Sequence, residues 1–428
     1  MVSAVLFITF FVLLVLNVPI SICLGLSSAA AILYSGTSLT IVATNIYSGI
    51  SKFLLLAIPF FVLSGNIMAK AGISTRLIRF VDTCVGHRKG GIANVCIIVA
   101  CFFGAISGSG PATVAALGAV LIPAMVERGG FSAPFSTALM ATASSIAIVI
   151  PPSIAFVVYA SITGVSIGDM FMAGIVPGIV MALLMMVVVT IYAIKRHYPR
   201  TKFPTFHEFG HALKEGFLPL MAPIILLVGI YGGVFTPTES AAIVVLYSLF
   251  LDVVVYRELS LKKFIAILKE TVRDSLTIAL IIAGATFFGY VATRAKIPQM
   301  ILTSMTSVVS SKVTLLLIIN VFLLIVGCFL ETASAITIVV PLILPLLTAY
   351  NINLTQFGII MVLNLMIGLL TPPFGLVLFV ISKIGHISIG RFSRALVPWL
   401  GALLAALLLV TFIPQLSLWF PTMLGMSV

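Results

Sequence analysis

Charged residues are scarce in this sequence, and their scarcity excludes a soluble fold. Only 8% of the 428 residues are Asp, Glu, Lys or Arg, whereas 61% are hydrophobic. A soluble domain carries roughly 25% charged residues and 45–50% apolar ones, so this chain cannot cover its outside with water-facing side chains. The mean hydropathy of +1.29 leads to the same conclusion. Most of the surface is therefore expected to face lipid.

Cysteine and histidine are also few, which disfavours several kinds of chemistry. The five cysteines form no CxxC pair, so we expect small core residues instead of a disulfide or metal framework. All five histidines lie in predicted loops, whereas a serine protease centred on Ser109 would need a histidine at the same depth. The sequence also lacks a phosphate-binding loop. Any energy-requiring function must therefore draw on an ion gradient or on a separate ATPase.

Apolar runs of about 20 residues recur along the whole chain, and this is the length that a helix needs to cross a bilayer. The runs do not alternate as the strands of a membrane β-barrel would, and only helices satisfy their backbone groups within one segment. The fold class is thus an all-α polytopic membrane protein. The first run, from Val2, has no basic start and no clear cleavage site, so we expect a retained helix.

Basic residues are distributed unequally between the two sides of the predicted topology. If the loop at 195–202 is cytoplasmic, 19 of the 23 Lys and Arg residues share its side, and only Lys52, Arg294, Lys296 and Lys312 face the other. A basic excess marks the cytoplasmic side. The net charge of +12 therefore reflects orientation in the lipid bilayer and not binding to nucleic acid.

An internal repeat is visible at a shift of 221 residues. The stretch from Pro151 to Gly164 resembles the one from Pro372 to Gly385, and prolines, glycines and serines align along with the apolar residues. On the charge-derived topology the two copies have opposite orientations. Inverted repeats with helices broken at matching positions are typical of secondary transporters.

Each repeat is expected to hold a re-entrant hairpin followed by a broken helix. Between the repeats, residues 259–273 are expected to form an amphipathic helix on the inner surface, with a new helix from about 275. The hairpins are placed at about 91–126 and 313–349, and the broken helices at about 134–163 and 355–385. The resulting division is 1–52 (N-terminal scaffold helices), 53–195 (first inverted repeat), 196–274 (cytoplasmic loop, scaffold helix pair and surface helix) and 275–428 (second inverted repeat).

Polar clusters at the hairpin tips and helix breaks carry the candidate chemistry. A hard cation prefers oxygen ligands, and broken membrane helices supply free carbonyls and half-helix ends. The first cluster joins the tip at 107–113 to the break at 144–152, and the second joins the tip at 331–334 to the break at 368–373. We expect both around one central cavity near the midplane. Ordinary loops and proline kinks are the alternative.

Four polar side chains in apolar surroundings need separate interpretation. Glu331 is the one acid placed deep in the membrane, so it is a candidate ion ligand, substrate contact or proton carrier, unless its hairpin is shallow and the carboxylate is solvated. Glu239 is more typical of a solvated residue at a helix start. Asn66 and Asn364 are expected to form hydrogen bonds between helices.

Three stretches in this order carry a resemblance to a known family. They are Gly104–Thr113, Ile150–Ser153 and Thr236–Ala241. The sequence resembles the large membrane subunit of tripartite ATP-independent periplasmic (TRAP) transporters over essentially its whole length, and it is most similar to the subunit from sialic acid systems.

The resemblance implies partners, an ion and a mechanism. It implies a small four-helix membrane subunit as a separate chain, a periplasmic substrate-binding protein, uptake of an organic acid driven by sodium, and location in the bacterial inner membrane. An elevator mechanism, in which a transport domain holding both hairpins slides against a scaffold, is implied as well. At least two Na⁺ sites are implied, the first with Ser107, Ser109, Ser145 and the backbone near Pro151, the second with Thr332, Ser334 and the backbone from Gly368 to Thr371. Gly110, Thr113 and Glu331 would lie near the substrate.

Three functional hypotheses remain open at this point. The first is sodium-coupled import of an organic acid, with sialic acid ahead of C4-dicarboxylates. The second is an autonomous sodium/dicarboxylate-type symporter that needs no binding protein. The third, from a different class, is a non-transporting assembly subunit or an intramembrane enzyme.

Overall fold

The regular structure of this chain is helical throughout the part that can be described. The computed structural model describes residues 1–38, 40–70, 72–196, 198, 203–372, 375–385 and 387–426, and within them nine helical stretches are long and apolar enough to span a membrane. Pro373 and most of the basic loop at 195–202 lie outside these ranges. In chain order the helices are α1 (Val2–Val15), α2 (Ile20–Tyr34), α3 (Thr40–Ile50), η1 (Phe53–Leu56), α4 (Ala57–Lys70), α5 (Ile73–Val85), α6 (Gly91–Ser107), α7 (Gly110–Glu127), α8 (Ala133–Ile146), α9 (Ile154–Thr163), α10 (Ile167–Lys195), α11 (Phe206–Tyr231), α12 (Pro237–Phe250), η2 (Leu251–Val255), α13 (Leu261–Arg294), α14 (Ile297–Val308), α15 (Lys312–Phe329), α16 (Thr332–Ala349), α17 (Leu354–Leu370), α18 (Leu376–Ile384), α19 (Ile389–Phe412) and α20 (Gln415–Met423).

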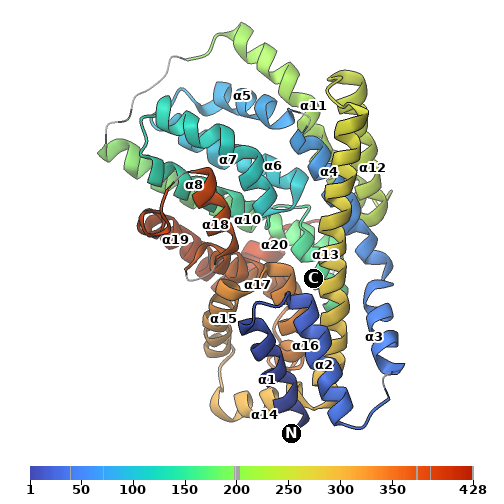
Figure 1. Cartoon of the computed structure of the whole chain (residues 1–428). Helices are drawn as coiled ribbons and strands as arrows, with labels where there is room; N and C mark the ends of the chain where they lie inside the picture. The colour runs from blue at the N-terminus through green and yellow to red at the C-terminus, as the bar shows by residue number, and fades with distance from the viewer. Residues whose placement is uncertain are drawn as a thin grey trace.

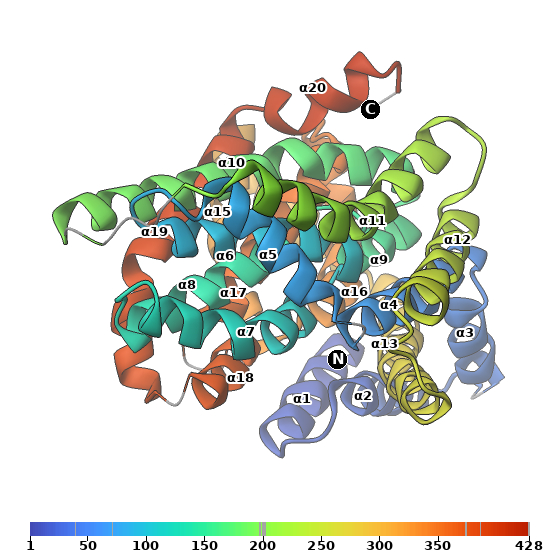
Figure 2. The same cartoon turned by 90° about the horizontal axis from the view of Figure 1, so that it is seen from above.

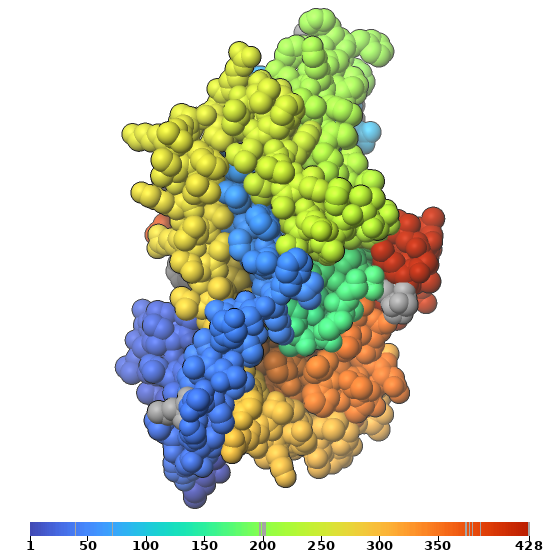
Figure 3. Space-filling view, turned by 90° about the vertical axis from the view of Figure 1, so that its right-hand side faces the viewer, coloured from blue at the N-terminus to red at the C-terminus, as the bar shows by residue number. Residues whose placement is uncertain are grey.

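Helix α13 is the longest element and organises one side of the molecule. Figure 1 shows α2 and α3 against one half of it and α4 against the other, in line with the contacts between these helices. On the side face in Figure 3, α3 and α4 form a continuous blue band, of which the α4 part lies between α13 and α12. At the opposite edge α20 lies along α10 (Figure 2).

The sequence predicted a surface helix at 259–273 and a separate helix from about 275, and this was wrong. Helix α13 is continuous from Leu261 to Arg294, so the boundary placed at 274 falls inside it. No glycine or proline occurs between Leu261 and Ala283, and these are the residues that interrupt helices. The charged turns therefore extend the apolar helix instead of forming a separate one.

Four short helices were not predicted as helices. They are α3, α5, α14 and α20, with 9 to 13 residues each. All are too short to cross the hydrocarbon, so a search for membrane-length apolar runs passes over them. Two of them, α5 and α14, each come directly before an expected hairpin.

The same order of elements occurs twice in the chain. A short helix (α5 or α14) precedes a helix pair (α6 and α7, or α15 and α16), then two helices separated by a break (α8 and α9, or α17 and α18), then a long helix with an internal proline (α10 or α19). The breaks lie between α8 and α9 and between α17 and α18, near Pro151 and Pro372, where the sequence placed them. The opposite orientation of the two copies in a membrane stays a prediction.

Helix starts carry the expected local signals. The N-cap threonines Thr205 and Thr236 each form a capping box with the glutamate three residues on, Glu208 and Glu239. In such a box the two side chains each satisfy a backbone N–H of the first turn. Glu239 Oε2 accepts from Thr236 N at 2.8 Å, so the prediction that Glu239 is a helix-start residue is confirmed.

Four connections between helices are joined by ion pairs at one end of the molecule. The charge distribution assigns all four to a single side of the membrane. These connections are 73–90, 127–133, 196–216 and 257–274. The pairs that join them are Arg128–Asp82 at 2.8 Å, Arg79–Glu215 at 3.7 Å and Arg76–Glu258 at 2.7 Å. The shared side is a property of the fold, and its assignment to the cytoplasm stays a prediction.

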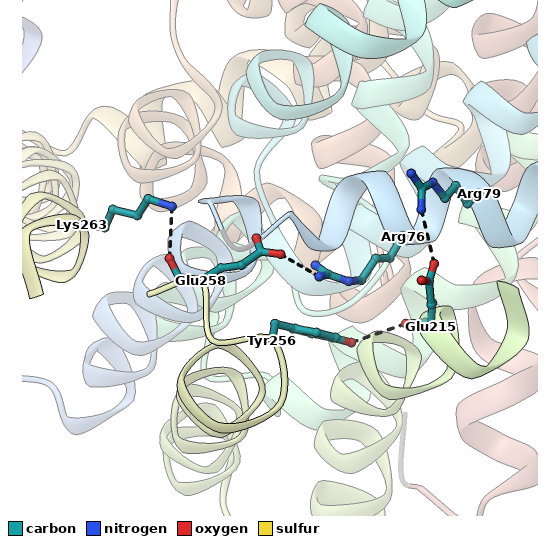
Figure 4. A network of polar contacts seen from close by, with 6 residues as sticks. All are labelled: Arg76, Arg79, Glu215, Tyr256, Glu258 and Lys263. Carbon is teal, nitrogen blue, oxygen red and sulfur yellow. Dashed lines mark hydrogen bonds and ion pairs between the residues drawn. The ribbon is translucent and has the colours of Figure 1, made fainter. Parts of the chain in front are cut away.

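Arg76 lies in a polar network between α5, α11 and the connection from α12 to α13 (Figure 4). Its guanidinium carbon lies 3.8 Å from the ring centroid of Tyr256, a cation–π geometry. The Tyr256 hydroxyl donates to Glu215 O at 3.4 Å, and Lys263 Nζ donates to Glu258 O at 3.1 Å. Burial raises the pKa of Tyr256 to about 12, so the phenol keeps the proton that it donates.

Buried amides join helices in the interior, as expected. Asn364 Nδ2 donates to Asn320 Oδ1 at 2.7 Å, and Asn320 Nδ2 donates to Thr411 Oγ1 at 3.1 Å, which connects α17, α15 and α19. Asn66 Nδ2 donates to Thr271 Oγ1 at 3.2 Å between α4 and α13. The predicted role of Asn66 and Asn364 as interhelical hydrogen-bonding residues is confirmed.

Two glycines bring α15 and α17 into backbone contact. A Cβ added at Gly368 would lie 2.4 Å from the carbonyl carbon of Gly327, and one added at Gly327 would lie 2.8 Å from Leu365 O. Small residues at helix interfaces in membranes allow such close approach. Gly368 is therefore first a packing residue, whatever its backbone carbonyl also does.

We expect Gly327→Ala to lower the stability of the detergent-solubilised chain by about 1–3 kcal/mol, because an added methyl group overpacks this contact. Thermal unfolding followed by circular dichroism would measure the change. Gly401→Ala is the matched control, since a Cβ at Gly401 in α19 meets nothing within 4 Å. Equal melting temperatures for the two variants would contradict the close contact between α15 and α17.

Candidate functional site

The first hairpin tip connects α6 to α7 and is a compact cluster of hydroxyls. Gly108 has a φ of +60°, a left-handed conformation that favours glycine. Ser109 is the N-cap of α7, and its Oγ accepts from Ala112 N at 3.5 Å. Thr113 Oγ1 donates to Ser109 O at 2.8 Å and lies 3.0 Å from Ser107 Oγ. The three hydroxyl residues named from the sequence at this tip thus lie together.

This tip packs directly on the first helix break. A Cβ added at Gly108 would lie 2.6 Å from Pro152 O, so only glycine permits the approach. Pro151 lies in the same connection between α8 and α9. Ser145, near the end of α8, is buried and donates to Thr142 O within its own helix. Its hydroxyl oxygen keeps lone pairs free, but its proton is already used.

The second tip connects α15 to α16, and Glu331 is the N-cap of α16. Its Oε2 accepts from Ala333 N at 2.9 Å and from Ser334 N at 3.3 Å. A carboxylate is stabilised at the positive end of a helix and satisfies N–H groups that have no partner within the helix. Glu331 therefore has a structural role that the sequence did not indicate.

Two hydroxyls beside Glu331 have no hydrogen-bond partner among the described residues. They are Thr332 Oγ1 and Ser334 Oγ, on residues only 3% and 0% exposed. One turn further along α16, Thr337 Oγ1 donates to Ala333 O at 2.9 Å. A buried polar group without a partner costs about 1–3 kcal/mol, so this pair is suited to receive a ligand.

The second break, between α17 and α18, follows a helix that packs against the first arm of this hairpin, α15. Thr371 Oγ1 donates to Ile367 O at 2.8 Å at the end of α17. Gly368 faces Gly327 of α15, as described above. The break is thus held against the arm of the hairpin that precedes it.

A cavity of about 100 Å³ lies where the two tips meet. The first tip contributes Gly108–Pro111 and the second contributes Glu331–Ala333. The other walls are Ile148, Ile154 and Ala155 from around the first break, Leu369 from α17 and Ile278 from α13. Two segments more than 200 residues apart in the chain therefore form one site.

The candidate site residues divide into those that line this cavity and those that do not. Ser109, Gly110, Glu331 and Thr332 line it. The others lie outside its lining: Ser107, Thr113, Ser145, Pro151, Ser334, Gly368 and Thr371. The two clusters thus meet at one cavity, while their roles as sodium ligands and substrate contacts stay predictions.

Ile278 is the lining residue furthest in the chain from the segments that sequence reasoning named, and Ile154 and Ala155 also lie outside them. Ile278 lies near the start of the apolar part of α13, beside Thr277, with no glycine or proline next to it to mark a break. Only the packing of α13 against α16 brings it to the cavity. No local signal could have identified it.

The charge of the cavity is set by one side chain. Within the described part of the chain, Glu331 is the only ionisable residue in the lining, and no Lys or Arg lines it. The N-terminus of α7 is capped by the neutral hydroxyl of Ser109, so its positive end has no compensating charge on the cap. The cavity therefore combines one carboxylate with one uncompensated helix end.

Comparison with known proteins decides the family. Residues 7–416 match the family model described as "Tripartite ATP-independent periplasmic transporter, DctM component". The chain belongs to this DctM family. It is a TRAP transporter large permease and, with its candidate membrane spans, a multi-pass protein of the inner membrane.

Relatives in the family are named for different organic acids. A C4-dicarboxylate TRAP transporter large permease protein of Pseudomonas aeruginosa is 41% identical, covering 94% of this chain and 95% of that protein. An isethionate TRAP transporter permease protein of Oleidesulfovibrio alaskensis is 41% identical over 97% of this chain and 66% of its own. A sialic acid TRAP transporter large permease protein of Vibrio cholerae is 38% identical over 92% of each chain. These identities do not single out sialic acid.

A solved structure shares the fold of this DctM-family chain. The YdaH transporter of Alcanivorax borkumensis matches with a TM-score of 0.62 at 16% identity, covering 90% of this chain and 88% of that one. At such low identity the likeness concerns the fold alone. It is nevertheless the fold of a transporter, in agreement with the family.

We expect Glu331→Gln and Glu331→Ala to separate the capping role of this side chain from its charge. The glutamine amide oxygen still accepts from Ala333 N, so this variant should melt close to the wild type. The alanine variant loses the cap, which costs about 1 kcal/mol, and should melt at a lower temperature. Equal melting temperatures for wild type and Glu331→Ala would show that the cap contributes nothing to stability.

Proposed function

We propose that this chain is the permease of a sodium-coupled TRAP transporter that imports an organic acid delivered by a periplasmic binding protein. The observation that carries the proposal is the meeting of both hairpin tips at one cavity that holds a carboxylate and adjoins two unpartnered hydroxyls. Family membership adds the partners, since TRAP large permeases work with a small membrane subunit and a periplasmic binding protein. The relatives are transport proteins and not enzymes.

The second tip suits a sodium ion. Thr332 Oγ1 and Ser334 Oγ are oxygen donors with no partner in the described chain, and the Glu331 carboxylate lies one residue from Thr332. Hard cations take ligands of this kind. Backbone carbonyls from Gly368 to Thr371 complete the proposed site. The other proposed sodium site lies at the first tip and is formed by Ser107, Ser109, Ser145 and the backbone near Pro151.

The first tip suits the acidic group of the substrate. The N-terminus of α7 favours a nearby anion because its backbone N–H groups and dipole are positive there, and Ser109 adds no charge that would compete. At α16 the Glu331 carboxylate already occupies the corresponding position. Gly110 and Thr113 would therefore lie nearer the substrate carboxylate than Glu331.

The repeated architecture supports an elevator mechanism for this transport. Both tips and both breaks belong to the two copies of the repeated unit, whereas α13 lies along one side with α2 and α3 packed on it. Movement of the repeated units as one body past these flanking helices would carry the cavity across the membrane without dismantling it. Alternating access in inverted-repeat transporters works through such rigid movements.

The substrate proposal is an organic acid, and the relatives supply the panel. They are named for C4-dicarboxylates, isethionate and sialic acid. All three are anions with a carboxylate or sulfonate group. The experiment below must distinguish this proposal from an autonomous symporter that needs no binding protein.

We expect labelled organic acid to enter proteoliposomes that hold this chain with its small membrane subunit only when a sodium gradient and the matching binding protein are both present. Succinate, isethionate and sialic acid, each with its own binding protein, form the panel. Glu331→Gln should reduce the uptake because it removes the charge of the cavity. Uptake with sodium alone would favour an autonomous symporter, and failure across the panel would contradict transport of organic acids.

We also expect sodium chloride to raise the melting temperature of the wild-type chain above that in potassium chloride of equal concentration. At ten times the dissociation constant the gain is about 1.4 kcal/mol. Thr332→Val and Ser334→Ala should lose the part of this gain that comes from the second tip but keep their stability in potassium, because neither hydroxyl makes a hydrogen bond that the fold would lose.

Thr348→Val on the same helix is the control for these variants. Its hydroxyl donates to Leu344 O within α16, far along the helix from the tip, so the sodium effect should persist. If Thr332→Val and Ser334→Ala respond to sodium as the wild type does, the second tip is not a sodium site.

A further inference from the structure

A second, larger cavity lies apart from the hairpin tips and plays no part in the proposal above. It has a volume of about 320 Å³, within the range of pockets that bind small molecules. Helix α13 forms one wall, and the ends of α3 and α9 and the middle of α16 form the others. The lining residues are Asn45, Lys52, Ser161, Ile162, Ile282, Ala285, Thr286, Gly289, Tyr290, Thr293, Thr337 and Pro341.

The polar groups of this cavity are mostly already bonded within their own helices. Thr286 Oγ1, Thr293 Oγ1 and Thr337 Oγ1 donate to backbone carbonyls one turn earlier, and Asn45 Nδ2 donates to Ile41 O. The three threonine protons are therefore unavailable to a ligand, whereas Asn45 Nδ2 keeps one of its two N–H groups. The charged donor must come from another side chain of the lining.

Lys52 and Tyr290 are the other lining residues with donors to spare. Lys52 Nζ donates one proton to Ser161 O at 2.6 Å, which leaves two of its three N–H groups. The Tyr290 hydroxyl accepts from Arg294 Nη1 at 3.4 Å, and its own proton goes to no described residue. An ammonium and a phenol with free protons form a site for an anion and not for a cation.

The charge around this cavity has one sign. No Asp or Glu lines it, and Lys52 forms no ion pair with any carboxylate of the described chain. Arg294 adds a second cation through its bond to Tyr290. Partial burial lowers the pKa of Lys52, and an anion bound beside it would stabilise the ammonium and offset this effect.

The position of Lys52 is fixed by close packing. A Cβ added at Gly49 would lie 2.6 Å from Thr286 Oγ1, so the end of α3 lies directly on α13. The bond from Lys52 to Ser161 then connects this pair of helices to the end of α9. Lys52 itself remains exposed at the surface, so a ligand can reach it from outside.

We propose that this cavity binds the carboxylate of a small organic acid through Lys52 Nζ and the Tyr290 hydroxyl, on the side of the membrane opposite the basic connections. Charge-assisted hydrogen bonds of this kind are the stronger ones in proteins. Binding of the carboxylate depends only on this cavity. That the bound acid is the transported substrate on its way to the hairpin tips rests on the proposed function.

The test measures the chemical reactivity of Lys52 in the purified full-length chain. Its rate of acylation by an amine-reactive reagent is followed by mass spectrometry with increasing succinate, and with neutral succinamide in parallel. At ten times the dissociation constant, succinate should slow the reaction of Lys52 about tenfold, and succinamide should not. Unchanged acylation of Lys52 at saturating succinate would overturn the proposal.

Lys312 is a matched internal control in the same sample. It is also exposed, is predicted on the same side, and donates to a backbone carbonyl, Asn351 O, at 3.2 Å, but it does not line the cavity. Its acylation should not respond to succinate. Equal protection of Lys52 and Lys312 would reveal a general effect of ionic strength and would also overturn the proposal. Because the wild-type chain is used, the result does not depend on the folding of a variant.

A second measurement separates this site from the transport mechanism. In the uptake assay Lys52→Gln should raise KM by about tenfold, the effect of losing one charged hydrogen bond, with kcat unchanged. Lys52→Arg should retain a low KM because it keeps the charge. Succinate protection without a change in KM would retain the site but detach it from the transported substrate. Protection in a chain that transports nothing would contradict the proposed function alone.

Discussion

Helix ends inside an apolar interior must find partners for their backbone groups. The central site of this protein is built where helices end in this way, at two hairpin tips and two helix breaks. In lipid an unpaired N–H or C=O has no water to bond with, so non-helical backbone is tolerated only where protein surrounds it. The first tip and the second break are accordingly each packed against another part of the chain. Gly108 contacts Pro152 O, and Gly368 contacts the backbone of Gly327. Ser109 and Glu331 cap the helices that begin at the tips.

This requirement explains which parts of the structure could be predicted from the sequence. Glycine, proline and serine mark the tips and breaks because few other residues satisfy a helix end there, so the positions of both helix pairs and both breaks were predictable. Apolar length identified the long spans. Short amphipathic helices such as α5 carry neither signal. The continuity of α13 was missed because its charged first turns resemble a surface helix, although no residue within them ends a helix.

The candidate site was predictable as a set of segments but not as a set of contacts. The sequence indicated that the tips at 107–113 and 331–334 should converge, and they do at one cavity. It could not show that Glu331 caps its own helix, because the same side chain could equally have pointed into open space. Nor could it indicate Ile278 or the cavity around Lys52, since both arise from contacts between helices distant in the chain.

The capping role of Glu331 bears on the proposed coupling of substrate to sodium. A second carboxylate brought into a cavity of this size is repelled by Glu331, and the repulsion is large because little water screens it. Protonation of Glu331 would weaken its bonds to Ala333 N and Ser334 N. A sodium ion on Thr332 and Ser334 would offset the charge while leaving both bonds intact. The acid that stabilises the fold would thus also make binding of the organic acid depend on a cation, and this dependence is what coupled transport requires.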